Sequence, residues 1–131
     1  IEALVIAKLT ALNCEVFLPF GHSGEIDFIV VTPSNQLKRI QVKKVSRRKG
    51  GYVARIMRQS GNGGRKRYQN LDYFVFFAND NFWIVPFSEV ATKGKIGLSS
   101  RECYREAWDL ILGQDNREEK AQDPADFPLL I

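Results

Sequence analysis

The sequence predicts an α+β fold (mixed α/β), with one central β-sheet flanked by helices. Three observations predict it: a helical apolar period opens the chain, six apolar segments with strand character follow, and a second helical period comes near residue 100. Because most apolar residues belong to the strand segments, the sheet is expected to form the core. A chain of 131 residues is long enough for one domain with a single core.

The first half of the chain is predicted to contain one helix and four strands. Apolar residues recur at helical spacing over residues 1–13, and Glu2 lies in the first turn, where a carboxylate suits the helix dipole. Turn-forming residues at 33–36 separate two strand segments and predict that these segments form a hairpin. The four expected strands are 15–20, 25–33, 37–45 and 51–57.

The second half is predicted to contain a hairpin and a helix. Two heavily apolar strands, 71–80 and 82–91, are separated by the hairpin signal "NDN". A serine cap and apolar residues on one face predict a helix over 99–112. We therefore expect a core domain at 1–113 and a tail at 114–131, whose apolar end "DFPLLI" is a candidate oligomer contact.

Composition and cysteine usage indicate a globular cytoplasmic protein. No apolar run approaches the ~20 residues that a membrane helix needs, and no basic-then-apolar signal segment is present. Cys14 and Cys103 are far apart and stand in no CxxC or Cys/His arrangement, which argues against a zinc site. Reduced thiols in the cytoplasm are the default for such a pair.

The charged residues are strongly segregated along the chain. The net charge is only +4, but residues 43–68 contain ten Lys or Arg and no Asp or Glu. From Arg101 onward the balance reverses, with eight acids against four bases. A chain with one strongly positive region is suited to a polyanion, and nucleic acid is the partner that this pattern favours.

The basic region is expected to form a DNA-binding β-hairpin at about residues 44–68. Two-stranded ribbons fit the major groove, where arginines can reach guanine edges while other bases contact phosphates. Solvated decoration and an unstructured tip at "SGNGGRKR" are the alternatives. The predicted DNA-binding residues are Lys44, Arg47, Arg48, Lys49, Tyr52, Arg55, Arg58, Arg65, Lys66 and Arg67.

Four polar residues are candidates for chemistry. Gln41 and Lys43 project from the same face of the strand 37–45. Asp27 lies in the preceding strand of the hairpin, so it can lie beside either of them, and a desolvated carboxylate there needs a cation, donors or a metal. Glu2, on a helix packed over the sheet, could supply a second carboxylate. Taken singly, Lys43 and Gln41 are more often surface residues, and Glu2 is more often a first-turn helix acid.

These residues resemble the motif of a known family. The helical Glu2, the glycine-containing turn before Asp27 and the "QVK" of residues 41–43 resemble the core of the PD-(D/E)XK nucleases. More closely, "GHSGEIDFIV" and "IQVKKV", with Gln41 in the position of an acid, resemble the homing endonucleases of PD-(D/E)XK type from bacterial group I introns. The order of elements extends the resemblance to about residue 112 and implies a restriction-endonuclease-like fold.

The resemblance implies a sequence-specific, Mg²⁺-dependent endonuclease, with Mn²⁺ as an alternative metal, that cuts double-stranded DNA into 5′-phosphate and 3′-hydroxyl ends. Glu2, Asp27, Gln41 and Lys43 would form the catalytic set. Asp27, the Gln41 side-chain oxygen and the Val42 carbonyl would bind the metal, with Glu2 binding directly or through water. Gln41 brings no charge, so Glu2 must supply the second negative charge. Lys43 would orient the attacking water and lower its pKa, or neutralise the transition state.

One active site per chain also implies an assembly. Cutting both strands of a duplex requires two copies, so a homo-oligomer is expected, either a dimer or a dimer of dimers. A restriction nuclease and a Holliday-junction-resolving nuclease of the same fold remain alternatives. A catalytically silent DNA-binding module is the rival that the neutral Gln41 favours.

Overall fold

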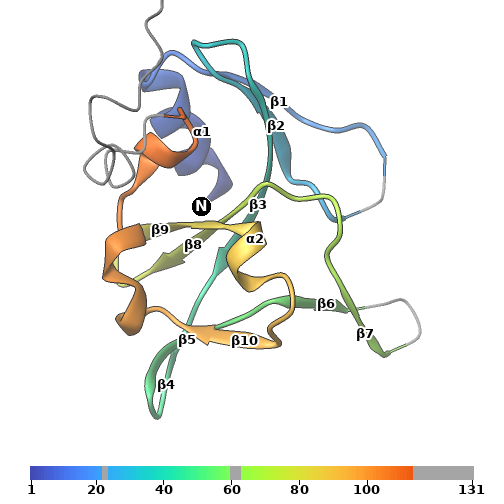
Figure 1. Cartoon of the computed structure of the whole chain (residues 1–131), viewed down its shortest axis with the longest axis vertical. Helices are drawn as coiled ribbons and strands as arrows, with labels where there is room; N and C mark the ends of the chain where they lie inside the picture. The colour runs from blue at the N-terminus through green and yellow to red at the C-terminus, as the bar shows by residue number, and fades with distance from the viewer. Residues whose placement is uncertain (22–23, 60–62, 114–131) are drawn as a thin grey trace, which may run out of the picture.

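The main sheet has five strands in the order β1-β2-β3-β8-β9 (Figure 1). The structure is a computed structural model that describes residues 1–21, 24–59 and 63–113. The five strands are β1 (Glu15–Phe17), β2 (Phe28–Val31), β3 (Leu37–Lys44), β8 (Tyr73–Ala78) and β9 (Asn81–Pro86). All pairs are antiparallel except β3 with β8, so the sheet is mixed, as predicted.

The two central strands carry the core. Ile40 of β3 and Phe74 and Phe76 of β8 have no exposed surface and belong to the hydrophobic core cluster. The helix α1 (Glu2–Ala11) packs beside β1 and buries Val5 and Leu9 completely. The predicted helix at the start of the chain and the predicted β2–β3 hairpin are both confirmed.

The β8–β9 hairpin is also confirmed, and its turn explains the sequence signal. Asn79 and Asp80 both have positive φ, 49° and 61°, a conformation that asparagine and aspartate tolerate better than most residues. Strand β9 ends at Pro86, earlier than predicted, and the following residues form the short helix α2 (Phe87–Val90). Proline is tolerated at this boundary because its missing N–H is not needed in a strand ladder that ends there.

The segment that follows β3 forms two small sheets in place of the single basic hairpin predicted at 44–68. One sheet has the order β10-β5-β4, and the other pairs β6 with β7. The predicted strand 51–57 is divided at Ile56, whose N–H donates to the Gly94 carbonyl at 2.9 Å. The strands are β4 (Arg47–Arg48), β5 (Gly51–Arg55), β6 (Met57–Gln59), β7 (Arg65–Arg67) and β10 (Lys95–Gly97).

The predicted helix at 99–112 is wrong. The chain forms two short 3-10 segments, η1 (Ser99–Tyr104) and η2 (Trp108–Leu110), separated by Arg105 in extended conformation and Glu106 with φ 52°. The edge of β9 explains the break: the Glu106 N–H donates to the Phe82 carbonyl, and the Phe82 N–H donates to the Glu106 carboxylate, both at 2.6 Å. Bonds to an unpaired strand edge thus replace the bonds of a continuous helix.

Some expectations lie outside this description. The tail at 114–131 with its candidate oligomer contact, and residues 60–62 of the glycine-rich stretch, are not among the described residues. Within the described ranges, no helix is long and apolar enough to cross a membrane.

Candidate active site

Asp27 is attached to β3 through both its backbone and its side chain. Its N–H donates to the Ile40 carbonyl at 2.8 Å, and its carboxylate Oδ2 accepts the Val42 N–H at 2.7 Å. The register of the hairpin, with Phe28 opposite Ile40, places Asp27 across from Gln41. The hairpin therefore brings Asp27 beside the "QVK" segment, as the sequence predicts.

Glu2 lies next to Asp27. Burial raises the pKa of Asp27 to about 6; the Val42 N–H bond lowers it, the Glu2 carboxylate raises it by repulsion and by a hydrogen bond, and Lys43 lowers it. A helix residue and a residue that directly precedes β2, 25 positions apart, thus present two carboxylates at one point. Two carboxylates this close favour a shared proton or a bound cation.

Gln41 is buried, with an exposed fraction of 9%. Its Nε2 donates a long 3.4 Å hydrogen bond to the Val42 carbonyl, while its Oε1 is buried without a hydrogen-bond partner. An unsatisfied buried acceptor costs about 1–3 kcal/mol, so this oxygen is costly for the fold alone. The solvent-facing alternative for Gln41 is therefore wrong.

The donor set fits a hard divalent cation. Within the described ranges no three His, Cys, Asp or Glu side chains come together, so a site here must rely partly on neutral oxygens. The orphaned Gln41 oxygen, the adjacent Val42 carbonyl and the carboxylates of Asp27 and Glu2 provide such a set. Oxygen ligands of mixed charge are those that Mg²⁺ and Mn²⁺ accept.

Lys43 is half-buried, and an aromatic ring holds it in place. Burial lowers the pKa of Lys43, Asp27 opposes this shift, and the positive charge of Arg55 adds to it. The Lys43 ammonium lies 5.0 Å from the centre of the Tyr68 ring, a cation–π contact. The Tyr68 ring packs edge-on against the Phe74 ring, and the two ring centroids are 5.2 Å apart.

Tyr68 is a residue that sequence reasoning missed. It lies just after β7, and the only local signal was a single aromatic residue directly after three bases. The same ring carries the Arg58 guanidinium at 5.8 Å, and Arg58 also pairs with Glu25 at 3.6 Å. Glu25 in turn accepts the N–H groups of Gln69 and Asn70. Arg58, predicted to contact DNA, is thus tied into the protein beside the site.

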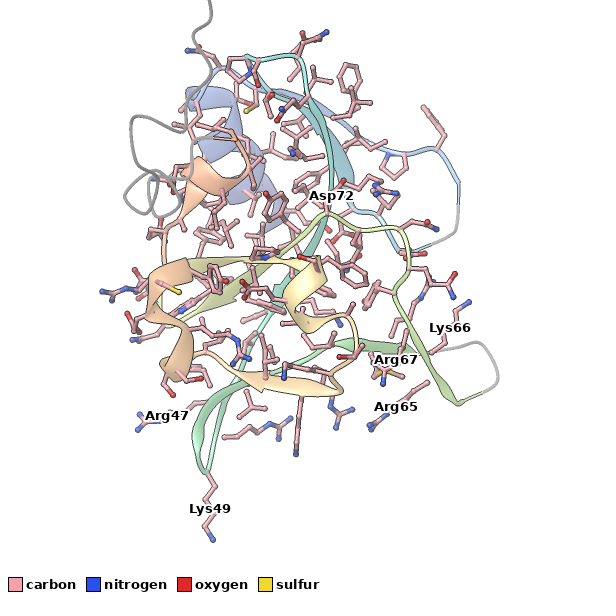
Figure 2. All side chains as sticks on the ribbon, viewed as in Figure 1. Arg47, Lys49, Arg65, Lys66, Arg67 and Asp72 are labelled. Atoms are coloured by element: carbon pink, nitrogen blue, oxygen red, sulfur yellow. The ribbon has the colours of Figure 1, made fainter. Side chains whose placement is uncertain are left out.

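The other predicted DNA-binding residues are spread over the end of β3, over β4, β5 and β7, and over the turn that holds Lys49. Figure 2 labels Arg47 and Lys49 at the β4–β5 hairpin. It also labels the bases of β7, which lie at the right of the view: Arg65, Lys66 and Arg67. Tyr52 and Arg55, both predicted DNA-binding residues, lie on opposite faces of β5, because they are three residues apart in a strand. Tyr52 packs against the core and Arg55 is exposed.

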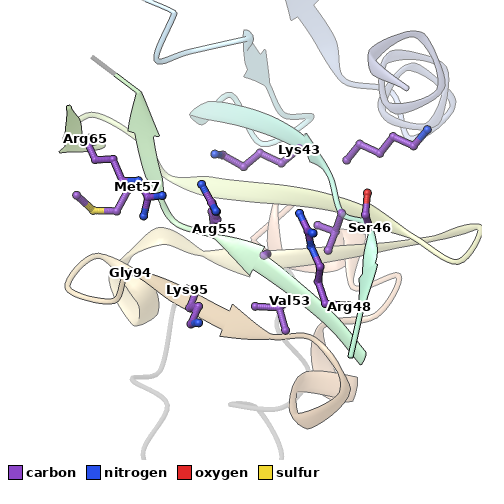
Figure 3. A pocket seen from close by; sticks show the side chains of 12 residues that line it. Lys43, Ser46, Arg48, Val53, Arg55, Met57, Arg65, Gly94 and Lys95 are labelled. Atoms are coloured by element: carbon purple, nitrogen blue, oxygen red, sulfur yellow. The ribbon is translucent and has the colours of Figure 1, made fainter. Parts of the chain in front are cut away.

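A groove of about 790 Å³ joins these bases to Lys43 (Figure 3). Six of its twelve lining residues are cations and none is acidic. The cations are Lys43, Lys44, Arg48, Arg55, Arg65 and Lys95. Lys43 of the candidate active site therefore faces a strongly positive groove, which suits a polyanionic substrate.

Comparison with known proteins assigns the family. A profile described as PD-(D/E)XK endonuclease matches residues 1–107, most of the chain. The chain belongs to this family. PD-(D/E)XK nucleases generally use divalent metal ions, in agreement with the oxygen donors collected at Asp27.

A solved structure supports the same fold. The structure of a bacterial homing endonuclease, I-Ssp6803I, matches with a TM-score of 0.68 and 24% identity, over 92% of this chain and 91% of that one. At this identity the match establishes the shared fold and confirms the predicted restriction-endonuclease-like architecture. No curated protein matches the chain significantly.

The raised pKa of Asp27 predicts a pH-dependent stability. An unfolded aspartate ionises near pH 3.8 and folded Asp27 near 6, so the folded state binds more protons in this window and loses stability as the pH rises through it. Asp27→Asn removes this loss. Its free energy of unfolding relative to the parent should therefore rise from about pH 4 to about pH 7.5, by on the order of 1–2 kcal/mol after allowance for solvent screening.

Urea unfolding in a metal chelator measures this difference, and Asp72→Asn is the matched control. Burial raises the pKa of Asp72, but the hydrogen bonds and charge of Arg39 lower it overall, so its stabilising effect is nearly complete above the unfolded value of 3.8. The free energy of unfolding of this variant relative to the parent should therefore change little from about pH 4 to about pH 7.5, and should fall with rising pH only below that range. The same pH dependence in both variants would contradict the assignment.

Proposed function

We propose that the chain is a Mg²⁺-dependent endonuclease that cuts double-stranded DNA at a specific sequence, as a homing endonuclease. The observation that carries the proposal is the buried, unpartnered Gln41 oxygen beside the carboxylates of Asp27 and Glu2. The fold alone gives this oxygen no role, whereas a hard cation gives it one. Gln41 in the position of an acid and the likeness to a bacterial homing endonuclease support homing as the activity.

The protein groups have separate tasks in this proposal. Asp27 and Glu2 supply negative charge to the metal, and Gln41 and the Val42 carbonyl add neutral oxygens. A divalent cation held by these groups would polarise the scissile phosphate and stabilise the charge that develops on the 3′ leaving oxygen. The anchoring of Asp27 to β3 fixes its position before any ligand arrives.

Lys43 handles the attacking water or the developing charge. Burial and Arg55 lower its pKa, which moves its amine closer to the neutral form that accepts a proton. The Tyr68 ring restricts where the amine can lie, and the positive groove presents the phosphate to it. Hydrolysis by water on the phosphorus leaves a 5′-phosphate and a 3′-hydroxyl.

Cleavage of a bound duplex tests the proposal. Selection from a pool of random duplexes isolates sequences that the parent binds, and cutting is then measured with Mg²⁺ or Mn²⁺. Asp27→Asn and Lys43→Met should each lower the cleavage rate by about 100-fold or more while DNA binding is retained. Lys8→Met, on the exposed side of α1, should cut like the parent.

Two results would contradict the proposal. A parent that binds duplex DNA but never cuts it, with either metal, would be a silent DNA-binding module. Cleavage that is unaffected in Asp27→Asn would refute this site while leaving the activity intact. Ligation of the cut ends checks for the expected 5′-phosphate and 3′-hydroxyl.

Gln41 can be tested without any cleavage assay. Gln41→Met keeps the length of the side chain but removes the buried unpartnered oxygen, so the metal-free protein should become about 1 kcal/mol more stable. The same change should weaken Mn²⁺ binding at least about 10-fold, as measured by calorimetry. Gln36→Ala, at an exposed turn, is the control and should change neither quantity. Parent-like Mn²⁺ affinity in Gln41→Met would show that Gln41 is not a ligand.

We also propose that two copies act on one duplex. Each chain has one site of this kind among its described residues, and two opposed strands need two sites. Exposed apolar side chains after β1, 65% for Leu18 and 107% for Phe20, support a contact between copies.

Sedimentation of the DNA complex tests this assembly. It should show at least two chains per duplex, and Phe20→Ser should weaken the assembly. Leu37→Ser, equally apolar and 65% exposed at the start of β3, is the control and should leave it intact. One chain per duplex would overturn the proposal.

A further inference from the structure

The sheet β10-β5-β4 presents a single polar face to the groove. Residues directly opposite in a strand pair share a face, and Lys95 lies opposite Arg55, Gly97 opposite Val53, and Arg48 opposite Gly51. Alternation along β5 puts its odd-numbered residues on this same face. Four of these residues line the groove beside Lys43: Arg48, Val53, Arg55 and Lys95 (Figure 3). The register and the lining of the groove agree for these four residues, and Ala54 of the opposite face also borders the groove.

Lys95 and Arg55 form an unusual cross-strand pair. Two cations directly opposite each other destabilise a sheet by a few tenths of a kcal/mol up to about 1 kcal/mol. Among the described residues, no acidic side chain lines the groove. Arg58 of β6, by contrast, forms an ion pair with Glu25. The fold gains nothing from placing Lys95 opposite Arg55, and an external polyanion would remove the repulsion.

Gly97 is a second, independent sign of an external ligand on this face. A Cβ added to Gly97 would meet no atom within 4 Å, and its backbone φ is one that other residues adopt. Glycine within a strand costs about 0.5–1 kcal/mol relative to alanine, and nothing inside the protein requires it here. Such glycines mark places where a ligand approaches the backbone closely. Together with Gly51, it leaves the middle of the face flat around Val53.

The strands of this face pair two at a time, which suits the major groove of duplex DNA. Strand β10 pairs with Val53–Arg55 and β4 pairs with Gly51 and Tyr52, so β5 forms a two-stranded ribbon with each neighbour in turn. The major groove of B-DNA is about 12 Å wide and admits a two-stranded ribbon. Each ribbon carries cations on this face: Arg55 and Lys95 in one, Arg48 in the other.

We propose that this face reads the DNA target: Arg55 contacts base edges from the central strand, while Lys95 and Arg48 hold phosphates on either side. Lys95 is a DNA-contact residue that lies outside the basic run of the sequence. The inference rests on the proposed function and specifies how that function selects its substrate. Arg55 is expected at a guanine, with Val53 beside it offering an apolar surface to a thymine methyl group.

Binding measured in Ca²⁺, without cleavage, tests this division of roles. Fluorescence anisotropy compares a duplex selected by the parent with a scrambled duplex over a range of salt concentrations. Lys95→Ala should weaken binding to both duplexes by the same factor, about 5-fold or more, and should lower the salt slope by about 0.9. Arg55→Ala should reduce the preference for the selected duplex by about 10- to 100-fold.

Two further variants make the test sharper. Lys93→Ala removes an equally exposed lysine two residues away that does not line the groove, and it should bind like the parent. Gly97→Leu adds a side chain to the middle of the face, so it should weaken DNA binding at least about 10-fold without lowering the unfolding temperature. Each variant is first checked for a parent-like unfolding temperature.

The outcomes separate this inference from the proposed function. Lys95→Ala binding like Lys93→Ala, or Gly97→Leu binding like the parent, would overturn the contact face. An equal loss on both duplexes in Arg55→Ala would overturn its role in reading bases. In each of these cases the parent still binds and cuts DNA. A parent that binds no duplex at all would instead refute the proposed function itself.

Discussion

The attachment of Asp27 to β3 is the interaction on which the rest of the site depends. Two hydrogen bonds join Asp27 to β3: its backbone N–H donates to the Ile40 carbonyl, and its carboxylate accepts the Val42 N–H. They hold a carboxylate in a partly buried place that would otherwise disfavour its charge. Glu2 adds a second carboxylate and makes the metal-free charge distribution still less favourable. Burial and charge repulsion therefore destabilise the metal-free site locally, and a bound cation would remove this destabilisation.

The amide of Gln41 limits this electrostatic cost. A carboxylate at this position would be a third negative group beside Asp27 and Glu2, and burial would make it expensive in the metal-free protein. An amide keeps the oxygen donor without adding charge, and its cost is one unsatisfied acceptor. The neutral residue is thus a reasonable way to keep a deep site foldable, and the exposed end of α1 provides the compensating charge through Glu2.

The parts of the site that local rules determine were predictable from sequence. A turn between two alternating strands fixed the β2–β3 register closely enough to put Asp27 beside Gln41, and the family resemblance added the role of Glu2. The helix at 99–112 failed because the free edge of β9 binds Glu106, a distant contact that no helical period can reveal. Lys95 was missed because β10 has only three residues, too few for a periodic signal. The proposed DNA contact of Lys95 depends on its pairing with Arg55, which lies 40 residues earlier.

The ring of Tyr68 has a consequence for any effort to change the target of this protein. The ring contacts both Lys43 and Arg58, and Arg58 belongs to the β6–β7 hairpin. Replacing β6 and β7 with the corresponding strands of a relative would move Arg58. It would thereby disturb the Tyr68 ring that restrains Lys43. Recognition and chemistry are therefore not separate modules here, and a transplanted specificity would need Tyr68, Arg58 and Glu25 carried over as one unit. In the β10-β5-β4 sheet, Arg55 also acts on the pKa of Lys43, so redesign there would begin with Lys95 and Arg48 and keep Arg55.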